Sequence, residues 1–137
     1  MAKLEISEAN LVVNPDAEAH FMRIQDAGKE VAVLAGDQLL AETGRARRVI
    51  EFGHQDFLDP VVYLPKEDVR VVLHPGDKTT HCPLKGDTTY FHTEAVGQEL
   101  EDIAWEYTDP YERAEALKGL VAFDPERVTI IERPMRD

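Results

Sequence analysis

Short apolar runs, interrupted every few residues by turn residues, limit what this chain can fold into more than any other feature. Residues 31–35 alternate between two faces and lead into Gly36 and Asp37, the pattern of a β-hairpin. Residues 69–74 alternate most regularly, with aliphatic side chains on one face, and 128–131 repeat the pattern. Such alternation is typical of strands that bury one face, so the sequence predicts a mainly β protein.

Further strands follow from the same pattern, although each is shorter or less regular. They are expected at 4–6, 20–24, 47–52, 61–64, 88–92, 103–107 and 121–123. A turn is expected at 14–16, where Asn-Pro-Asp occurs, and Pro65 should end the strand before it because proline has no amide proton. Many short strands of this kind predict two antiparallel sheets packed together.

One segment carries the signals of a helix. Asp109 is a natural N-cap, Pro110 suits the first helical position, and Glu112 completes an arrangement like a capping box. Gly119 can adopt the positive φ that ends a helix. The sequence therefore predicts one short helix near residues 110–118, of about ten residues, which tertiary packing must hold because it is too short to be stable alone.

The length and charge of the chain set its class. With 137 residues, 43% of them hydrophobic, residues 1–137 are expected to form a single domain with its own core. The net charge of -12 repels phosphates, so we expect neither nucleic acid nor a membrane as partner. The sequence has no secretory signal, no apolar run of membrane length and one cysteine, Cys82, which together predict a cytoplasmic protein.

The least ordinary stretch is THCPLKGDTTYF, residues 80–91, where a histidine, the only cysteine, a proline, a lysine and a glycine follow closely. Its simplest interpretation is a turn, because Pro83 fixes φ and Gly86 permits a positive φ. A turn requires neither His81 nor Lys85, so a reactive thiol, a metal site and a ligand site all stay open.

A catalytic role would depend on Cys82, His81 or Lys85. A nucleophilic thiol needs a base within reach, but adjacent residues of an extended chain, such as His81 and Cys82, point to opposite faces. Lys85 would favour the thiolate if it lay across the turn. The alternative is a small buried thiol without a reaction, which is common for free cysteine. The sequence thus leaves the catalytic residues unknown.

Metal binding is a second interpretation of the same region. His74, His81, Cys82 and His92 lie close in the sequence and would converge if their strands paired. Their spacing matches none of the usual zinc patterns. We therefore predict neither a bound structural metal nor a cofactor.

A ligand site is the interpretation that we favour. Histidine, lysine and arginine supply donors, and tyrosine and tryptophan supply flat apolar walls with polar tips. Arg45 begins the basic cluster RARR, and arginine suits bidentate binding of a carboxylate or phosphate. Core packing for Trp105 and a solvated strand edge for RARR are the alternatives. The predicted pocket, for a small anionic molecule, is lined by Arg45, Tyr63, His81, Cys82, Lys85, Tyr90, Trp105 and Tyr107.

Several segments together resemble a family of small bacterial domains called domain of unknown function 427. They are AETGRA at 41–46, VYLPKEDV at 62–69, THCPLKGD at 80–87, IAWEYTDP at 103–110 and GLVAF at 119–123, within a family-like core of about residues 29–131. The resemblance implies a β-tent fold, in which two antiparallel sheets meet at an angle. Proteins of that architecture carry a cysteine zinc site at the tip or bind small ligands between the sheets. Leu84 stands where the family commonly has an aromatic residue, which removes a stacking contact.

The resemblance and the predicted pocket together imply a small-molecule binding or sensor module. The alternative is an enzyme, for example a transferase, because an old label of the family names nucleotidyl transfer. The sequence gives that label little support, since it contains no glycine-rich phosphate loop of the P-loop kind.

Overall fold

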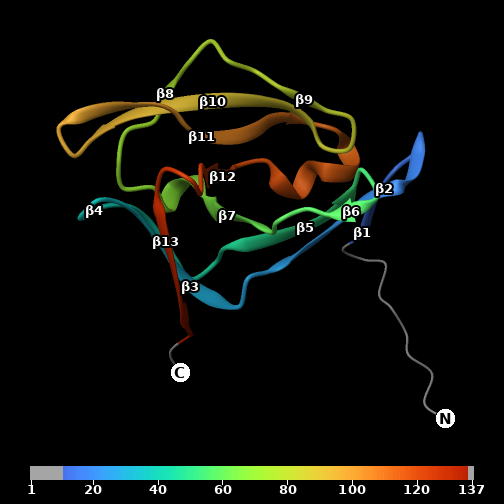
Figure 1. The fold of residues 1–137 in the computed structure, drawn as a ribbon, viewed down its shortest axis with the longest axis horizontal. Coiled ribbons are helices and arrows are strands. Elements are labelled where there is room, and N and C mark those ends of the chain that lie inside the picture. Colours follow the sequence, from blue (N-terminus) through green and yellow to red (C-terminus); the bar gives the residue numbers. More distant parts are fainter. Residues whose placement is uncertain (1–10, 136–137) are drawn as a thin grey trace.

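A computed structural model describes residues 11–135 as a strongly bent antiparallel β structure with two sheets (Figure 1). Ten strands form the larger sheet. They are β1 (Leu11–Asn14), β2 (Ala17–Asp26), β5 (Arg47–Gly53), β6 (Asp56–Phe57), β7 (Val61–Pro65), β8 (His74–Pro75), β9 (His81–Cys82), β10 (Gly86–Ala95), β11 (Gln98–Pro110) and β12 (Leu120–Phe123). Their order is β1-β2-β5-β7-β12-β11-β10-β8, with β6 beside β5 and β9 beside β10.

The smaller sheet has three strands, in the order β13 (Thr129–Pro134), β3 (Lys29–Ala35), β4 (Gln38–Thr43). Strands β3 and β4 form the predicted hairpin, and Gly36 adopts a positive φ of 58° in its turn. Val31 and Val33 are buried and face the larger sheet, as the alternation of residues 31–35 predicted. The prediction of a mainly β protein with two antiparallel sheets is therefore confirmed.

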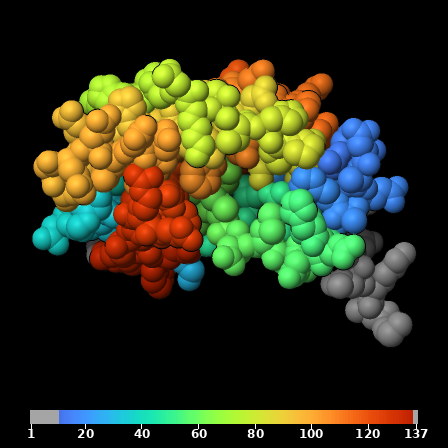
Figure 2. All heavy atoms as spheres, turned by 45° about the horizontal axis from the view of Figure 1, so that its top comes forward, coloured from blue at the N-terminus to red at the C-terminus, as the bar shows by residue number. Residues whose placement is uncertain are grey.

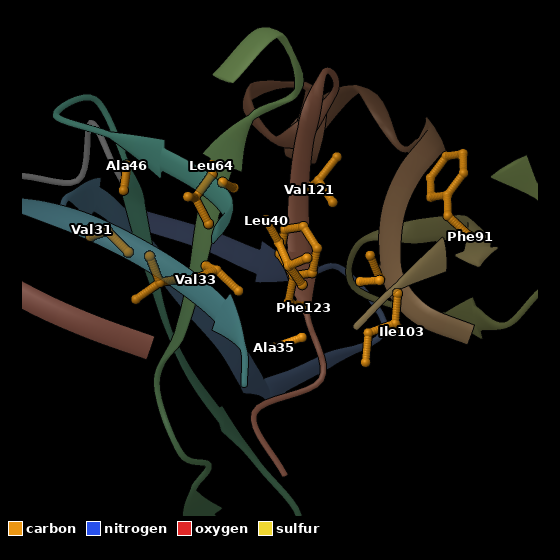
Figure 3. Close-up of a cluster of buried hydrophobic side chains, with 14 residues drawn as sticks. Val31, Val33, Ala35, Leu40, Ala46, Leu64, Phe91, Ile103, Val121 and Phe123 are labelled. Carbon is orange, nitrogen blue, oxygen red and sulfur yellow. The ribbon is translucent and has the colours of Figure 1, made fainter. Parts of the chain in front are cut away.

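Two hydrophobic clusters lie on opposite faces of the larger sheet. The first fills the space between the two sheets, where Val33 and Leu40 of the smaller sheet pack with Leu64, Val121 and Phe123 of the larger one (Figure 3). The register explains this, since Val121 of β12 pairs with Leu64 of β7 and both side chains point the same way. This cluster fastens the small sheet to one half of the large one.

The second cluster lies on the other face and is enclosed by the large sheet itself. It joins Met22 and Val49, from β2 and β5, to Tyr63, Leu84 and Tyr107. Strands β2 and β5 lie near one end of the strand order, whereas Leu84 lies in the turn between β9 and β10, near the other end. The sheet must therefore curve so that its two halves face one another, as the upper and lower layers of Figure 1 show, although it does not close into a barrel.

The strand predicted at 69–74 is wrong for most of its length. A 3-10 helix at Lys66–Asp68 precedes it, Val69 makes only an isolated bridge to Ala41, and just His74–Pro75 forms β8. The alternation in this segment nevertheless reflects burial of one face, because Val69, Val71 and Leu73 pack against the first cluster. The segment buries one face without a continuous partner strand, and period-two burial alone does not distinguish this from a strand.

The short helix near 110–118 is confirmed in position, but it is a 3-10 helix, Glu112–Leu117, rather than about ten residues. Asp109 and Pro110 are not its cap, because they still pair with β10 as the end of β11, and Tyr111 caps the helix without a side-chain bond. Ala114 has non-helical angles and kinks it. Strand pairing thus overrides the capping signal.

The turn at 14–16 and the positive φ of Gly119 are both present in the structure. Asn14 ends β1 and its side-chain Oδ1 accepts a 2.9 Å hydrogen bond from the Asp16 amide, which confirms the turn at 14–16. Gly119 has the expected positive φ, and the strand predicted at 4–6 lies outside the described residues. Within residues 11–135, no helix has the length and apolar character needed to cross a bilayer.

The first cluster makes a quantitative prediction. Leu64 is 1% exposed, so Leu64→Ala should lower the free energy of unfolding by about 2–5 kcal/mol through lost packing and a cavity. Val72 is 68% exposed, so Val72→Ala should change it by less than about 0.5 kcal/mol. Urea unfolding of both variants measures this, and an equal loss at Val72 would contradict the structure of 69–74.

Candidate functional site

A buried ion pair lies where the two halves of the large sheet face each other. Lys85, in the turn before β10, is 8% exposed, and its Nζ donates to Oε1 of Glu51 on β5. Two hydrogen bonds hold the turn that carries Lys85, because Arg113 donates to the carbonyl oxygens of Pro83 and Leu84. A lysine this deeply buried needs such a partner, since an unpaired buried charge is very costly.

The second oxygen of Glu51 continues the polar network. Its Oε2 lies 2.8 Å from Nε2 of His20 on β2, and Nδ1 of His20 lies 3.3 Å from Nδ2 of Asn14. The orientation of Asn14 is set, because its Oδ1 already accepts from the Asp16 amide. Nδ2 must therefore donate to Nδ1 of His20, which leaves the ring proton on Nε2 to be donated to Glu51. Gly53 leaves room for the ring, since a Cβ there would lie 3.2 Å from His20 Cδ2.

The environment shifts the pKa values of three groups in this region. Burial alone would raise the pKa of the Glu51 carboxyl, but Lys85 and His20 outweigh it and hold that pKa below its ordinary range. Burial raises the pKa of Tyr63 and of Tyr107 well above the ordinary range of a phenol. Glu51 is thus ionised at neutral pH and both tyrosines are neutral.

A hollow of about 550 Å³ opens beside this network, and we call it the histidine hollow. It is lined by Asn14, Ala17, Ala19, His20, Glu51, Gly53, His54, Gln55, His81, Cys82 and Pro83. These residues come from the β1–β2 hairpin, from β5 with its following turn, and from β9, and the first and last of these segments lie side by side in Figure 2. Three of the five histidines of the chain line it.

Cys82 is half-buried and lines the histidine hollow. One ligand atom each of Cys82, His20 and Glu51 lie within 4.8 Å of one another. His81 is adjacent to Cys82 in sequence, but its imidazole is engaged elsewhere, as the alternation of an extended chain predicts: its Nδ1 lies 2.6 Å from Asp87 Oδ1 and its Nε2 lies 3.3 Å from the Tyr111 hydroxyl. The imidazole beside the thiol is instead that of His20, which is far from Cys82 in the sequence.

The predicted aromatic walls form one group behind the hollow rather than its lining. Trp105 Nε1 donates to the Tyr63 hydroxyl at 3.3 Å, and the rings of Trp105 and Tyr90 lie 6.0 Å apart. Lys85 Nζ lies 5.6 Å from the centre of the Tyr107 ring. Tyr63, Trp105 and Tyr107 belong to the second hydrophobic cluster. Of these three, Tyr107 contacts the ion pair, and His81 and Cys82 are the predicted residues that line the hollow.

Arg45 is not brought to these residues. It lines a different hollow of about 390 Å³, together with Arg47 and Lys118. Its guanidinium is exposed and donates to Glu67 at 3.1 Å and to Asp68 at 3.2 Å. These two carboxylates raise the pKa of Arg45 and occupy the group that was predicted to hold an anion.

Sequence reasoning missed Asn14, His20, Glu51, His54 and Gln55. One signal was present: Glu51 is a carboxylate on the buried face of the strand at 47–52, in register with Met22 of β2. An acidic residue at such a position needs a cationic partner. That partner is Lys85. It reaches Glu51 only because the sheet curves, and local sequence patterns do not encode this curvature.

The fold and the site define a small, open, two-sheet antiparallel β domain with a buried lysine–glutamate pair beside a histidine-lined hollow. The chain belongs to the family described as domain of unknown function (DUF427), whose model matches residues 23–133. The resemblance found in the sequence is thereby confirmed. Comparison with curated proteins gives no match.

Gly86 should be essential to the position of Lys85. It has a φ of 114°, and a Cβ there would lie 2.6 Å from the Asp109 carbonyl oxygen, at the end of β11. Gly86→Ala should therefore cost about 2–5 kcal/mol, from backbone strain together with the clash. Gly97 also has a positive φ, 75°, but open space around it, so Gly97→Ala should cost only about 1–2 kcal/mol. Denaturant unfolding compares the two, and equal losses would contradict the close approach.

The lowered pKa of Glu51 predicts a pH-dependent contribution to stability. A carboxyl whose folded pKa lies below its unfolded value of about 4.3 stabilises the fold fully above that pH and loses the effect as the pH falls through the folded pKa. Glu51→Gln should therefore be less stable than the wild type at pH 7, and the gap should shrink below about pH 4. Urea midpoints from pH 3 to pH 7 measure it, and a gap independent of pH would contradict the assignment.

Proposed function

We propose that this domain binds a small anionic molecule in the histidine hollow. The observation that carries the proposal is the composition of the lining. Three histidines and a glutamine face a space that contains one carboxylate, Glu51, and that carboxylate is already neutralised by Lys85. Ala17, Ala19 and Pro83 supply apolar surface between these polar groups, as in small-molecule sites generally.

Charge supports the same ligand class. The chain has 27 acidic and 15 basic residues, so most of its surface repels anions. In the histidine hollow this bias is weaker, because Lys85 offsets the charge of Glu51 and the other polar lining groups are imidazoles and amides rather than carboxylates. The second hollow, beside Arg45 and Arg47, is richer in formal charge, but Glu67, Asp68 and Asp26 already pair with those guanidinium groups.

The turn between β5 and β6 provides an independent argument. His54 and Gln55 have φ values of 52° and 67°, which non-glycine residues adopt at a cost of about 1–3 kcal/mol. Hairpin turns that need two positive φ values usually contain Asn-Gly instead. Strain of this kind is concentrated at ligand-binding sites, and both residues line the hollow.

The geometry supports binding rather than a reaction in which Cys82, His81 or Lys85 takes part. Both ring nitrogens of His81 face Asp87 and Tyr111, Lys85 is held by Glu51, and both nitrogens of His20 are occupied. None of His81, Lys85 and His20 is therefore free to take the proton of the thiol, as a nucleophilic cysteine requires. We propose that the protein works in the cytosol, where a single thiol at a ligand site stays reduced.

The test is a panel of anions, comprising inorganic phosphate, short mono- and dicarboxylates and nucleoside monophosphates, titrated by calorimetry in the presence of a chelator. His54→Asn removes the imidazole, and asparagine tolerates the positive φ, so it should weaken binding about tenfold or more with little loss of stability. His74→Asn is the matched control, because His74 is exposed and stacks on His92 away from the hollow.

Alkylation of Cys82 by iodoacetamide reports the location directly, since Cys82 is the only cysteine and lines the hollow. A bound anion should slow the reaction in the wild type. An anion that binds equally well to His54→Asn, or that leaves the alkylation rate unchanged, binds elsewhere and would contradict the proposal.

A further inference from the structure

We propose that His20, Glu51 and Cys82 bind a divalent metal ion of the zinc class at the base of the histidine hollow. The three side chains come from separate strands, β2, β5 and β9, and offer nitrogen, oxygen and sulfur atoms within 4.8 Å of one another. Zinc accepts this combination of donors, whereas magnesium and calcium prefer oxygen alone. The inference concerns an ion rather than the anionic ligand, and it does not depend on the proposed function.

The distances suit a tetrahedral ion after small movements. Bonds of about 2.0–2.3 Å to zinc place neighbouring ligand atoms roughly 3–4 Å apart. Glu51 Oε2 and His20 Nε2 are already 2.8 Å apart, joined by a hydrogen bond that the ion would replace. Three protein ligands leave one position free, as in zinc sites that bind a further molecule, and the histidine hollow lies on that side.

Binding of the ion requires protons to leave Cys82 and to move between the two ring nitrogens of His20. The Cys82 thiol loses its proton to solvent and binds as a thiolate, and Glu51 binds as the carboxylate that pairs with Lys85. The proton on Nε2 of His20 leaves, and Nδ1 takes one up, so the ring stays neutral. Nδ1 then needs an acceptor, which the Asn14 amide supplies when it turns over and gives up the bond that its Oδ1 accepts from the Asp16 amide. One proton is released per ion, and the ion with the thiolate, the carboxylate and Lys85 carries a net charge of +1.

Lys85 need not be displaced. It donates to Oε1 of Glu51, whereas the ion would take Oε2. Outer hydrogen bonds of this kind hold metal-binding carboxylates in place. The sequence-based prediction of no metal considered His74, His81 and His92 as partners of Cys82, and missed that the nearest donors come from β2 and β5.

The experiment titrates Co²⁺ and Zn²⁺ into full-length protein that has been stripped of metal. One Co²⁺ per chain should produce thiolate-to-cobalt charge-transfer absorption, and one Zn²⁺ should abolish it. Cys82→Ser should remove the absorption, and His20→Gln should weaken binding more than tenfold. Replacing His74 and His92 by Gln together is the control, because these stacked rings lie outside the site and their loss should change nothing.

A second variant tests the arrangement of Asn14. Asn14→Asp keeps an oxygen for the Asp16 amide and offers a carboxylate to Nδ1–H of His20, which favours metal at Nε2. Zinc affinity should rise about tenfold. Glu51→Gln is less decisive because it also breaks the ion pair with Lys85.

Cobalt binding without the charge-transfer absorption, or zinc affinity unchanged in both Cys82→Ser and His20→Gln, would overturn the metal proposal. Anion binding is measured with a chelator and metal binding without any anion, so either result can fail while the other stands.

Discussion

The ion pair between Lys85 and Glu51 is the interaction on which the rest of the structure depends. In the strand order, β5 and β10 are separated by β7, β12 and β11, yet this contact joins the residues on and next to them. A buried charge that loses its partner costs about 3–5 kcal/mol, so the pair favours the curved sheet over a flatter one. The same curvature encloses the second hydrophobic cluster and brings β9 beside β2.

Local rules accounted for those parts of the fold in which neighbouring residues decide the outcome. The hairpin at 31–43 follows from alternation and Gly36, and the turn at 14–16 follows from Asn14. The segment at 69–74 was wrong because one-sided burial there comes from packing against the first cluster and not from a ladder of hydrogen bonds. The 3-10 helix replaced a longer one because β11 keeps Asp109 in its pairing with β10. In both places a long-range partner decided the local structure.

The residues of the site also fall into two groups, those that local sequence made visible and those that only the tertiary structure brings together. His81, Cys82 and Lys85 stood out in the sequence because a plain turn does not need them. His20 and Glu51 did not, because their significance comes from the register of β2 with β5 and from the curvature that delivers Lys85. Arg45 stood out for its charge, but its direction is set by Glu67 and Asp68, which follow more than twenty residues later. Composition identified unusual residues, and only the tertiary pairing decided which of them meet.

The two oxygens of Glu51 have different partners. Oε1 accepts from Lys85 inside the protein, and this contact holds the two halves of the sheet. Oε2 faces His20 at the base of the histidine hollow, next to Cys82. Loss of Lys85 should therefore act mainly on folding, whereas loss of His20 leaves the ion pair intact and acts mainly on the hollow. A single buried carboxylate thus supports the fold with one oxygen and leaves the other at the hollow, where we propose that a metal ion binds.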